Sequence, residues 1–411
     1  MPARSEALQR QTKRYEAKRQ AVLDGAVRLF NQKGVKGTTL ADVAQSVGLI
    51  TNSVTYYYRK KEELATACLL RSVAALEEMI ADALREAGAA DRIRAILRLY
   101  LERLAASASG EEAPLMSFSD MRALTSPHVE LAFEAYNGMF RHLRELFRQD
   151  GSPALARPEL NARAHLLVSL MHGVRHWIDL YEPEDYGRVG ERIADILIRG
   201  LAAPGSAWRP VALPPIAWPS ADEVSPEAFL RSATILINEQ GYRGASVEKI
   251  SARLKVTKGS FYHHNDNKDD LVADCFARTF AVVREVQRAA ETAGATGWDR
   301  LSAAAGGLVR YQLSAEGPLL RNSAFSALPE GPRDDTKRTM DRLARRFGSF
   351  VVDGMMDGSI RPLDPAIAAR LVDGMVNAAG ELRRWVPGAT ADDAAEIFAR
   401  PLFMGVLDGG A

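Results

Sequence analysis

The chain has 411 residues, of which 47% are hydrophobic, and this is enough for two or three domains with buried cores. Its 53 basic and 52 acidic residues leave a net charge of +1, so the overall charge does not mark it as a nucleic-acid-binding or membrane-binding protein. Two cysteines exclude a disulfide framework, and no apolar run reaches the ~20 residues of a membrane span or resembles a signal peptide. We therefore expect a soluble, cytoplasmic protein with no membrane partner and no cofactor.

The average charge hides a basic stretch at the start of the chain. Within residues 1–20, six basic side chains stand against two acidic ones. Such an arm can reach the phosphates or the minor groove of DNA, and a solvated tail is the alternative. A first helix is predicted over 16–33. The basic residues are Arg4, Arg10, Lys13, Arg14, Lys18 and Arg19.

Two short helices joined by a tight turn are predicted next. Apolar residues recur at helical spacing over 40–47, and Thr38 and Thr39 precede them as candidate caps. Gly48 follows, and glycine readily takes the left-handed conformation that ends a helix. The second segment, 51–58, is polar and aromatic. This is the pattern of a helix-turn-helix, whose second helix can lie in the major groove.

The same stretch occurs twice. Residues 34–64 recur without a gap as residues 241–271, at a shift of 207 positions, so that Gly34 falls on Gly241. A period of about half the chain indicates two whole domains rather than an array of short repeats.

The rest of the first half predicts further helices and no alternating strand, so the expected fold class is all-α. The correspondence between the halves continues to their ends, because Arg-His-Trp at 175–177 answers Arg-Arg-Trp at 383–385. Duplication and fusion of a complete unit is the simplest explanation. Helices are expected over 61–86, 91–108, 115–124, 127–149, 159–181 and 185–201.

A proline-rich stretch separates the two halves. Proline at this density favours an extended conformation and excludes helix, which predicts a semi-rigid spacer. Trp208 and Trp218 leave two alternatives open, a spacer that packs on a domain and one that does not. The prolines stand at 204, 210, 214, 215, 219 and 226.

Both copies resemble the N-terminal DNA-binding domain of TetR-family transcriptional regulators. The first copy has an apolar helix ending in LF-x3-G (29–34), the Thr38-Thr39 pair and the ending YYY-x-x-K-x-x-L (56–64), and the second has VTKGSFYHH (256–264). The resemblance implies two tandem units, each with a three-helix helix-turn-helix domain followed by a helical ligand-binding and dimerisation domain. The expected domains are 1–60 (basic arm and first helix-turn-helix), 61–202 (first ligand-binding domain), 203–225 (linker), 226–267 (second helix-turn-helix) and 268–411 (second ligand-binding domain).

The resemblance also implies which side chains contact double-stranded DNA. Asparagine and lysine can bond to base edges, and hydroxyls and aromatic rings can contact phosphates or thymine methyl groups. A lysine that begins a helix beside the DNA backbone attracts phosphate. In the first copy these residues are Thr38, Thr39, Thr51, Asn52, Ser53, Thr55, Tyr56, Tyr57 and Lys61, and in the second they are Ser246, Lys258, Gly259, Ser260, Tyr262, His263 and Lys268.

Five positions depart from the family pattern, among them Asn265 and Asp266, which replace an aromatic and a basic residue. Asn52 stands where the family usually has a small residue, and Thr55 where it has an aromatic one. In the second copy, Lys255 replaces the turn glycine, and Asp266 would repel a phosphate. We therefore expect the second copy to bind more weakly or to recognise a different half-site.

A pocket for an effector is implied within the helices after residue 90 in one half and after residue 297 in the other. Its candidate lining is mostly apolar, which suits a small apolar or aromatic ligand. Residue by residue, the alternative is an ordinary core position. The candidates are Phe118, Met121, Tyr136, Phe140, His172 and Trp177 in the first half, and Tyr311, Phe325, Met375 and Trp385 in the second.

The leading hypothesis is a ligand-responsive repressor in which the two halves form an intramolecular pseudo-dimer. The last two helices of each half (159–201 and 365–407) would pack together, and because the two recognition segments differ, the operator would be an imperfect palindrome. One alternative is a homodimer with one competent helix-turn-helix per chain. Another is a ligand-binding or interaction module that has lost DNA binding.

Other functional motifs are set aside. Cys68 and Cys275 are repeat equivalents, expected as buried small hydrophobes rather than redox sensors. His172, His176 and Asp179 share a helix face but lack the further ligands of a metal site. The chain carries none of the phosphate-loop, nucleophile-elbow or zinc-protease signatures, so no enzyme is predicted.

Overall fold

The computed structural model describes residues 2–149, 155–214, 216, 225–254, 268–328 and 330–408. These residues form helices and no β-strand, apart from a single isolated bridge between Ala202 and Ile360, and the all-α expectation is confirmed. None of the described helices is long and apolar enough to cross a membrane. The chain divides into two compact units, residues 1–79 with 103–142 (unit 1) and residues 80–102 with 143–411 (unit 2).

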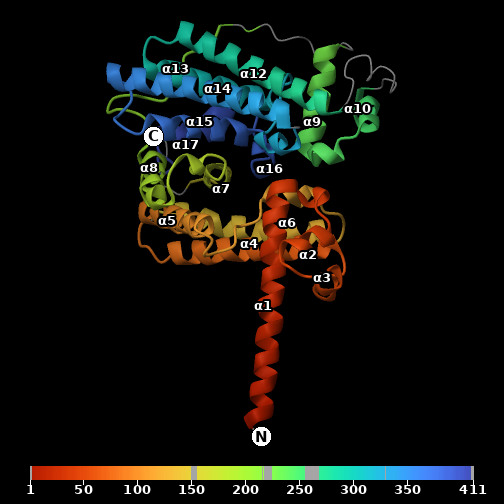
Figure 1. Ribbon diagram of the computed structural model, residues 1–411. Helices are drawn as coiled ribbons and strands as arrows, with labels where there is room; N and C mark the ends of the chain where they lie inside the picture. The colour runs from red at the N-terminus through yellow and green to blue at the C-terminus, as the bar shows by residue number, and fades with distance from the viewer. Residues whose placement is uncertain are drawn as a thin grey trace. The chain divides into compact units, whose positions relative to one another are not determined.

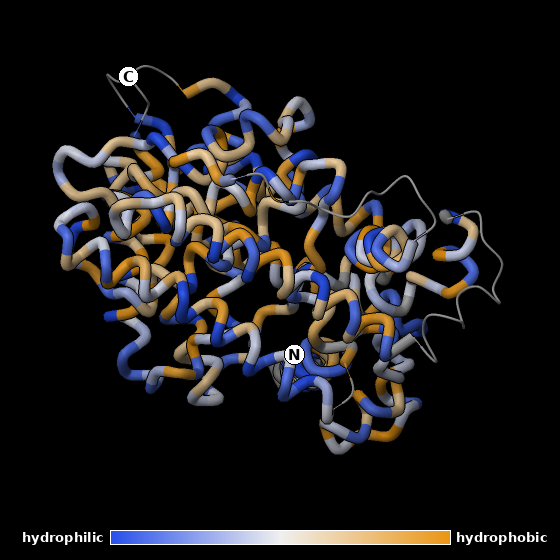
Figure 2. The backbone as a smooth tube through the Cα atoms, turned by 90° about the horizontal axis from the view of Figure 1, so that it is seen from above, coloured by the Kyte–Doolittle hydropathy of each residue, from blue (hydrophilic) through white to orange (hydrophobic). Residues whose placement is uncertain are grey.

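Unit 1 carries the first helix-turn-helix (Figure 1). Its first helix begins at Pro2, much earlier than expected, because residues 3–18 are mostly strong helix formers without glycine or proline. Proline is tolerated in the first turn of a helix. The predicted basic arm is therefore the hydrophilic first part of this helix (Figure 2). The elements are α1 (Pro2–Lys33), η1 (Val35–Gly37), α2 (Leu40–Ser46), α3 (Thr51–Tyr57), α4 (Lys61–Ala83, whose last residues belong to unit 2), η2 (Phe118–Ala123) and α6 (His128–Leu143).

The first-half helices of unit 2 are shorter than the sequence predicts. The helix expected over 159–181 ends at Val174, and a separate short turn follows. Similarly, the helix expected over 115–124 is the six-residue 3-10 turn η2 of unit 1. The unit 2 elements are α5 (Ala89–Ala108, whose last residues belong to unit 1), η3 (Arg144–Phe147), α7 (Arg157–Val174), η4 (Ile178–Leu180), η5 (Pro183–Asp185) and α8 (Tyr186–Arg199).

The second half lies entirely in unit 2, where α12, α13 and α14 run side by side (Figure 1). One apolar core joins its helix-turn-helix to the helices behind, since Phe229 and Ile250 pack in the same cluster as Phe276 and Leu343. The elements are α9 (Pro226–Gly244), α10 (Val247–Leu254), α12 (Lys268–Ala293), α13 (Gly297–Leu313), η6 (Asn322–Ala327), α14 (Glu330–Asp357), α15 (Pro365–Ala379), α16 (Leu382–Trp385), the π-helical turn η7 (Ala395–Ala399) and α17 (Arg400–Met404).

The last helices of the two halves pack against each other inside unit 2. The contacts are reciprocal, because α7 packs on its own repeat equivalent α15, while α7 meets η7 and α8 meets α15. Helix α8 also packs on α17. Two glycines with positive φ allow the closest approach: a Cβ at Gly200 would lie 2.3 Å from the Phe403 carbonyl oxygen, and one at Gly405 would lie 2.5 Å from that of Ile198. The backbones that follow α8 in the first half and α17 in the second half are therefore in direct contact.

The linker packs on the second half. Trp208 lies 5.0 Å from the Phe403 ring, between ring centroids. The Trp298 indole donates to the Ala207 carbonyl at 3.0 Å. Farther on, Leu213 packs over Gly307, where a Cβ would come within 2.6 Å of Leu213 Cδ1. Of the two alternatives, packing is therefore the correct one for Trp208. Trp218 lies outside the described residues.

Candidate nucleic-acid interface

The first helix-turn-helix is fixed by a cap and a turn that the sequence predicts. Thr39 caps α2, accepting from the Asp42 backbone at 3.1 Å while its own backbone donates to the Asp42 carboxylate at 2.8 Å. The Thr39 hydroxyl also donates to the Asp42 carboxylate at 2.8 Å, and this bond together with the one from the Thr39 backbone holds the pKa of Asp42 below its usual value. Gly48, with φ +66°, makes the turn to α3. Val43 and Val54 are fully buried, which pins both helices to the core.

Thr38 requires a correction. Its side chain has no exposed surface, and its hydroxyl donates to the Gly34 carbonyl oxygen at 3.0 Å. A hydroxyl held in this way positions the turn before α2, so Thr38 has a structural role instead of the predicted DNA contact.

Helix α3 presents a polar and aromatic face to solvent. Tyr56 is 74% exposed, and Thr51 and Asn52 are also exposed. The Thr55 hydroxyl is held within the helix by donating to the Asn52 carbonyl oxygen at 3.1 Å. The remaining predicted residues of this copy are exposed (Thr39) or half-buried (Ser53, Thr55, Tyr57 and Lys61).

An aromatic cluster supports the end of α3, and sequence reasoning missed it. Tyr15 of α1 packs against Tyr57 at 4.9 Å and Tyr56 at 6.1 Å, between ring centroids. One turn along α1, the Arg19 guanidinium donates to the Tyr58 hydroxyl at 3.1 Å. The early start of α1 thus braces the candidate recognition helix. The sequence gave no signal of this contact, because the first helix was expected to begin at residue 16, after Tyr15.

Most of the second recognition segment lies outside the described residues. This applies to Lys258, Gly259, Ser260, Tyr262 and His263, and to the departures Lys255, Asn265 and Asp266. Ser246 is half-buried and accepts from the Lys249 backbone at 3.3 Å, which places it as the cap of α10. Lys268 begins α12, and nothing is described of its side chain.

An asparagine clamp ties the first helix-turn-helix to the loop that precedes η2. The Asn31 side chain donates to the Leu115 carbonyl at 2.9 Å and accepts from the Ser117 backbone at 2.8 Å. The Ser72 hydroxyl of α4 accepts from the intervening Met116 backbone at 2.8 Å. Three hydrogen bonds therefore hold this loop to α1 and α4.

The second half repeats this clamp with equivalent residues. Asn238, which lies 207 positions after Asn31, donates to the Leu319 carbonyl at 2.8 Å and accepts from the Arg321 backbone at 3.0 Å. Thr279, at the position of Ser72, accepts from the Leu320 backbone at 2.9 Å. Both helix-turn-helix units are thus connected to the helices behind them by the same polar contacts.

A buried arginine adds a second connection in the second half. Arg278 of α12 donates to the Glu227 carboxylate at 2.5 Å and to the carbonyl oxygens of Glu316 at 2.7 Å and Pro318 at 3.0 Å. It also donates to the Tyr311 hydroxyl at 2.9 Å. Burial raises the pKa of Tyr311 to about 12, so its phenol keeps the proton that it donates to Glu316 O.

The ten candidate pocket residues are divided between the units. Phe118, Met121, Tyr136 and Phe140 lie in unit 1, where the rings of Phe118 and Tyr136 meet edge to face at 5.0 Å between centroids. Phe325 packs against the helix-turn-helix core of the second half, and Met375 is fully buried. The remaining four lie in unit 2 and are His172, Trp177, Tyr311 and Trp385.

The candidate metal ligands do not form a metal site in the described part of the chain. No group of three or more histidine, cysteine, aspartate or glutamate side chains there could hold an ion. Burial, and then the charges of Arg175 and His176, lower the pKa of His172 to about 3, so its imidazole is neutral. Both cysteines are buried as expected, and burial raises the pKa of each to about 12, which makes them unreactive thiols.

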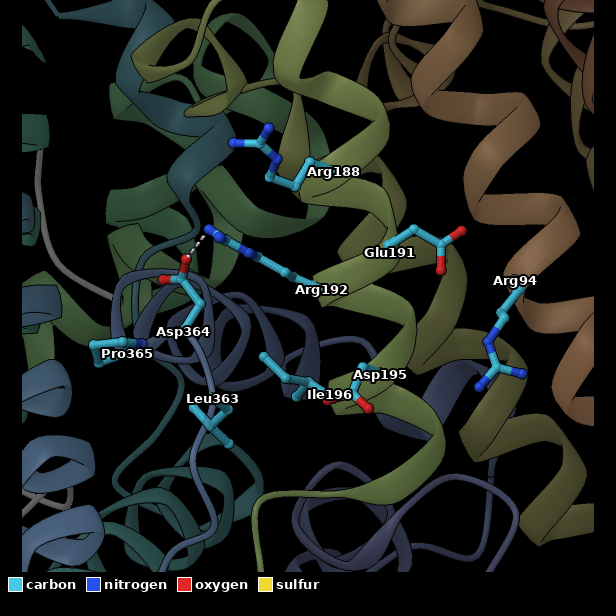
Figure 3. A pocket seen from close by; sticks show the side chains of 9 residues that line it. All are labelled: Arg94, Arg188, Glu191, Arg192, Asp195, Ile196, Leu363, Asp364 and Pro365. Carbon is cyan, nitrogen blue, oxygen red and sulfur yellow. Dashed lines mark hydrogen bonds and ion pairs between the residues drawn. The ribbon is translucent and has the colours of Figure 1, made fainter.

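A groove of about 720 Å³ opens in unit 2 and contains none of the ten candidates. It lies between α5, α8 and the loop that leads into α15 (Figure 3). Two ion pairs involve its lining, Arg192 with Asp364 at 2.6 Å and Asp195 with Arg361 at 2.7 Å. A charged lining of this kind does not suit an apolar ligand. Its residues are Arg94, Arg188, Glu191, Arg192, Asp195, Ile196, Leu363, Asp364 and Pro365.

Comparison with known families agrees with this geometry. The profile of bacterial regulatory proteins of the tetR family matches residues 22–68 and again residues 229–275. The profile of a tetracyclin repressor-like C-terminal domain matches residues 294–386. The chain belongs to the TetR family. Within the family it is a tandem form, because both matches to the N-terminal domain occur in one polypeptide.

Curated relatives cover parts of this TetR-family chain. The TetC protein of transposon Tn10 from Escherichia coli is 35% identical over 75 residues, 18% of this chain and 38% of TetC. The HTH-type transcriptional repressor DhaR from Mycobacterium sp. (strain GP1) is 27% identical over 136 residues, 32% of this chain and 68% of DhaR. The chain therefore spans less than half of the length of TetC and about two thirds of that of DhaR.

Solved structures align with about two fifths of the chain. Apo AibR, at 22% identity and a TM-score of 0.36, covers 42% of this chain and 94% of its own. The TetR-family regulator PfmR from Thermus thermophilus, at 21% identity and a TM-score of 0.37, covers 43% of this chain and 97% of its own.

Proposed function

We propose that this protein is a transcriptional regulator that binds a double-stranded DNA operator through its two helix-turn-helix units. The observation that carries the proposal is the exposed face of α3, in which Asn52 and Tyr56 face solvent on a helix held by a capped α2. Such a helix fits the major groove. The relative DhaR is named a repressor, and we propose the same direction of control here.

We further propose that the two halves act as an intramolecular pseudo-dimer. The reciprocal packing of α7 and α8 on α15 and α17 supports this arrangement, since helices of one half meet their own equivalents in the other. One chain would then supply both DNA-binding helix-turn-helix units. Because the recognition segments TNSVTYYY and KGSFYHHN differ, the operator should be an imperfect palindrome.

The proposed DNA contacts are those on exposed or half-buried positions. Asn52 is suited to base edges, and Tyr56 to phosphate or a thymine methyl group. Lys61 and Lys268, at helix starts, would hold phosphate. The other proposed residues are Thr39, Thr51, Ser53, Thr55 and Tyr57 in the first copy, and Ser246, Lys258, Gly259, Ser260, Tyr262 and His263 in the second.

The proposed effector is a small apolar or aromatic molecule that lowers the affinity for DNA. The two asparagine clamps, at Asn31 and Asn238, are suited to transmit a shift of the ligand-binding helices to the helix-turn-helix units. Coupling between effector and operator must be reciprocal in binding free energy. If saturating operator DNA leaves effector affinity unchanged, this part of the proposal is refuted.

Footprinting and gel shift on the promoter region beside the gene, with the mass of the complex measured, test the proposal. One chain protecting an asymmetric pair of half-sites is the expected result. Two chains per site would instead favour a homodimer with one competent helix-turn-helix per chain. No salt-dependent DNA binding would favour a module that has lost DNA recognition.

A further inference from the structure

The two halves contribute donors to their interface in unit 2 from different elements. In the second half Arg361, which precedes α15, donates to the carbonyl oxygens of Gly200 at 2.8 Å and Asp195 at 3.0 Å, and in the first half the donors lie on α7. Arg163 of α7 is 2% exposed, and its guanidinium donates to the carbonyl oxygens of Val406 at 2.9 Å and Asp408 at 2.7 Å. Burial lowers the pKa of Arg163, but the neighbouring carboxylates oppose this shift. The end of the second half is thus capped by a donor from the first.

Two more donors on the same helix reach into the second half. The Asn161 side chain donates to the Trp385 carbonyl at 2.7 Å. His165, 3% exposed, lies with Nε2 at 2.9 Å from the Ala378 carbonyl oxygen, and because a carbonyl can only accept, Nε2 carries the proton. The His165 ring also stacks on Phe398 at 5.3 Å between centroids. Helix α7 therefore carries a row of donors facing carbonyl oxygens of the second half.

The equivalent helix of the second half has no such row. At the shift of 207 positions between the repeats, which aligns Pro158 with Pro365 and Gly173 with Gly380, the three donor positions become Ala368, Arg370 and Val372. Alanine and valine have no polar side-chain hydrogen, and Arg370 is paired with Asp341 of its own half at 2.9 Å. A second half paired with a copy of itself would therefore have no donor at the positions of Asn161 and His165.

Shape opposes self-pairing of the first half as well. Leu170 of α7 lies against Gly374 of α15, where a Cβ would come within 3.0 Å of Leu170 Cδ2. The first-half equivalent of Gly374 is Leu167. A first half paired with a copy of itself would thus bring Leu170 onto a leucine where the present interface has no side chain, and packed interiors tolerate such overpacking poorly.

We propose that this interface is heterotypic, so that the first half pairs with a second half and neither half pairs with a copy of itself. The donors of α7, which the second half lacks, disfavour a pair of two second halves. The missing side chain at Gly374, which the first half fills with a leucine, disfavours a pair of two first halves. Heterotypic pairing deepens the pseudo-dimer part of the proposed function and rests on it, since it names the partner that each half accepts. The partner is the other half of this chain, not a second copy of the same half.

Removing one donor gives the first test. A specific protease sequence is inserted between residues 217 and 224 of the full chain, the folded protein is cleaved, and dissociation of the halves is followed on dilution by native mass spectrometry. His165→Leu is expected to weaken association of the halves by about 5- to 100-fold, because a buried carbonyl loses its donor. His165→Gln is the matched control, since its amide keeps a donor and should restore most of the affinity. Equal affinity of His165→Leu and the unchanged chain would overturn the proposal.

The second test measures selection directly. Two cleaved preparations that differ in isotopic mass are unfolded together and refolded without DNA, and the masses of the resulting complexes are measured by native mass spectrometry. Complexes of one first and one second half are expected, with labels mixed at random. Pairs of two first halves or two second halves would overturn the inference. Failure of DNA binding would leave this result unaffected, and a swapped dimer of uncleaved chains would refute only the intramolecular part of the proposed function.

Discussion

Replacing Arg278 by methionine should separate a buried ion pair from a partly exposed one within a single chain. The Arg278 side chain is 4% exposed, and its partner Glu227, at 2.5 Å, is 24% exposed. The same position in the first half is Arg71, whose pair with Asp24 at 2.6 Å is 26% and 23% exposed. Water can replace much of the second pair and little of the first.

The expected loss for Arg278→Met is about 3–5 kcal/mol of unfolding free energy, because removal leaves the Glu227 carboxylate and the Pro318 carbonyl oxygen without the donor that Arg278 supplied. Hydration of the partly exposed Glu227 favours the lower end of that range. Arg71→Met should cost about 1 kcal/mol or less, as partly exposed pairs do. Glu227→Gln in the Arg278→Met background should recover part of the loss by removing the unpaired charge.

Urea unfolding is the assay, followed by circular dichroism for both variants. Tryptophan fluorescence adds a signal from unit 2 alone, because all five tryptophans fall in its residues. Equal small losses for Arg278→Met and Arg71→Met would refute the reasoning, since burial would then have no effect on the strength of the pair.

Three further predictions concern single side chains. Burial raises the pKa of Asp373 to about 6, so its ionisation destabilises the fold as pH rises through that value. In urea titrations Asp373→Asn should therefore stabilise the protein by about 1–3 kcal/mol at about pH 8 but not at about pH 4. Asn238→Ala removes the hydrogen bond to Leu319 O and its partner bond, and should lower the unfolding free energy by about 1–3 kcal/mol; a change within about 0.5 kcal/mol would contradict the clamp. Asn52→Ala should weaken operator binding by about 1–3 kcal/mol at unchanged stability, whereas Thr38→Ala should lower stability without altering base preference, as a footprint combined with thermal unfolding would reveal.

Local sequence signals predicted local structure well. Glycine at position 48 indicated a left-handed turn, and its φ is +66°. Cys68 and Cys275 were expected in the core, and both are buried. The gapless repeat indicated two equivalent units, and the chain matches the TetR N-terminal domain twice. Each of these inferences depends on residues close together in sequence or on the repeat itself.

Contacts between distant residues were not predictable in the same way. The clamp at Asn31 reaches a carbonyl 84 positions away, and Arg163 reaches one 243 positions away. Every residue except the last has such a carbonyl acceptor in a peptide bond, so the partner of a donor leaves no mark in the sequence. The packing of the last helices of the two halves was expected from the family resemblance, but nothing in the sequence indicated which carbonyls Arg163 and His165 would contact. Tyr15 likewise gave no sign of its contact with α3.

The packing of α7 on α15 changes how mutations act on this protein. In a symmetric homodimer, each substitution at the interface is made twice, and its energetic effect is doubled. Here a substitution in α7 occurs once, and its counterpart in α15 stays as it was. A substitution that would dissociate a homodimer, because its loss of association free energy is counted twice, can therefore be tolerated here, where the loss is counted once. The two halves can acquire different sequences one residue at a time, each buffered by an unchanged partner.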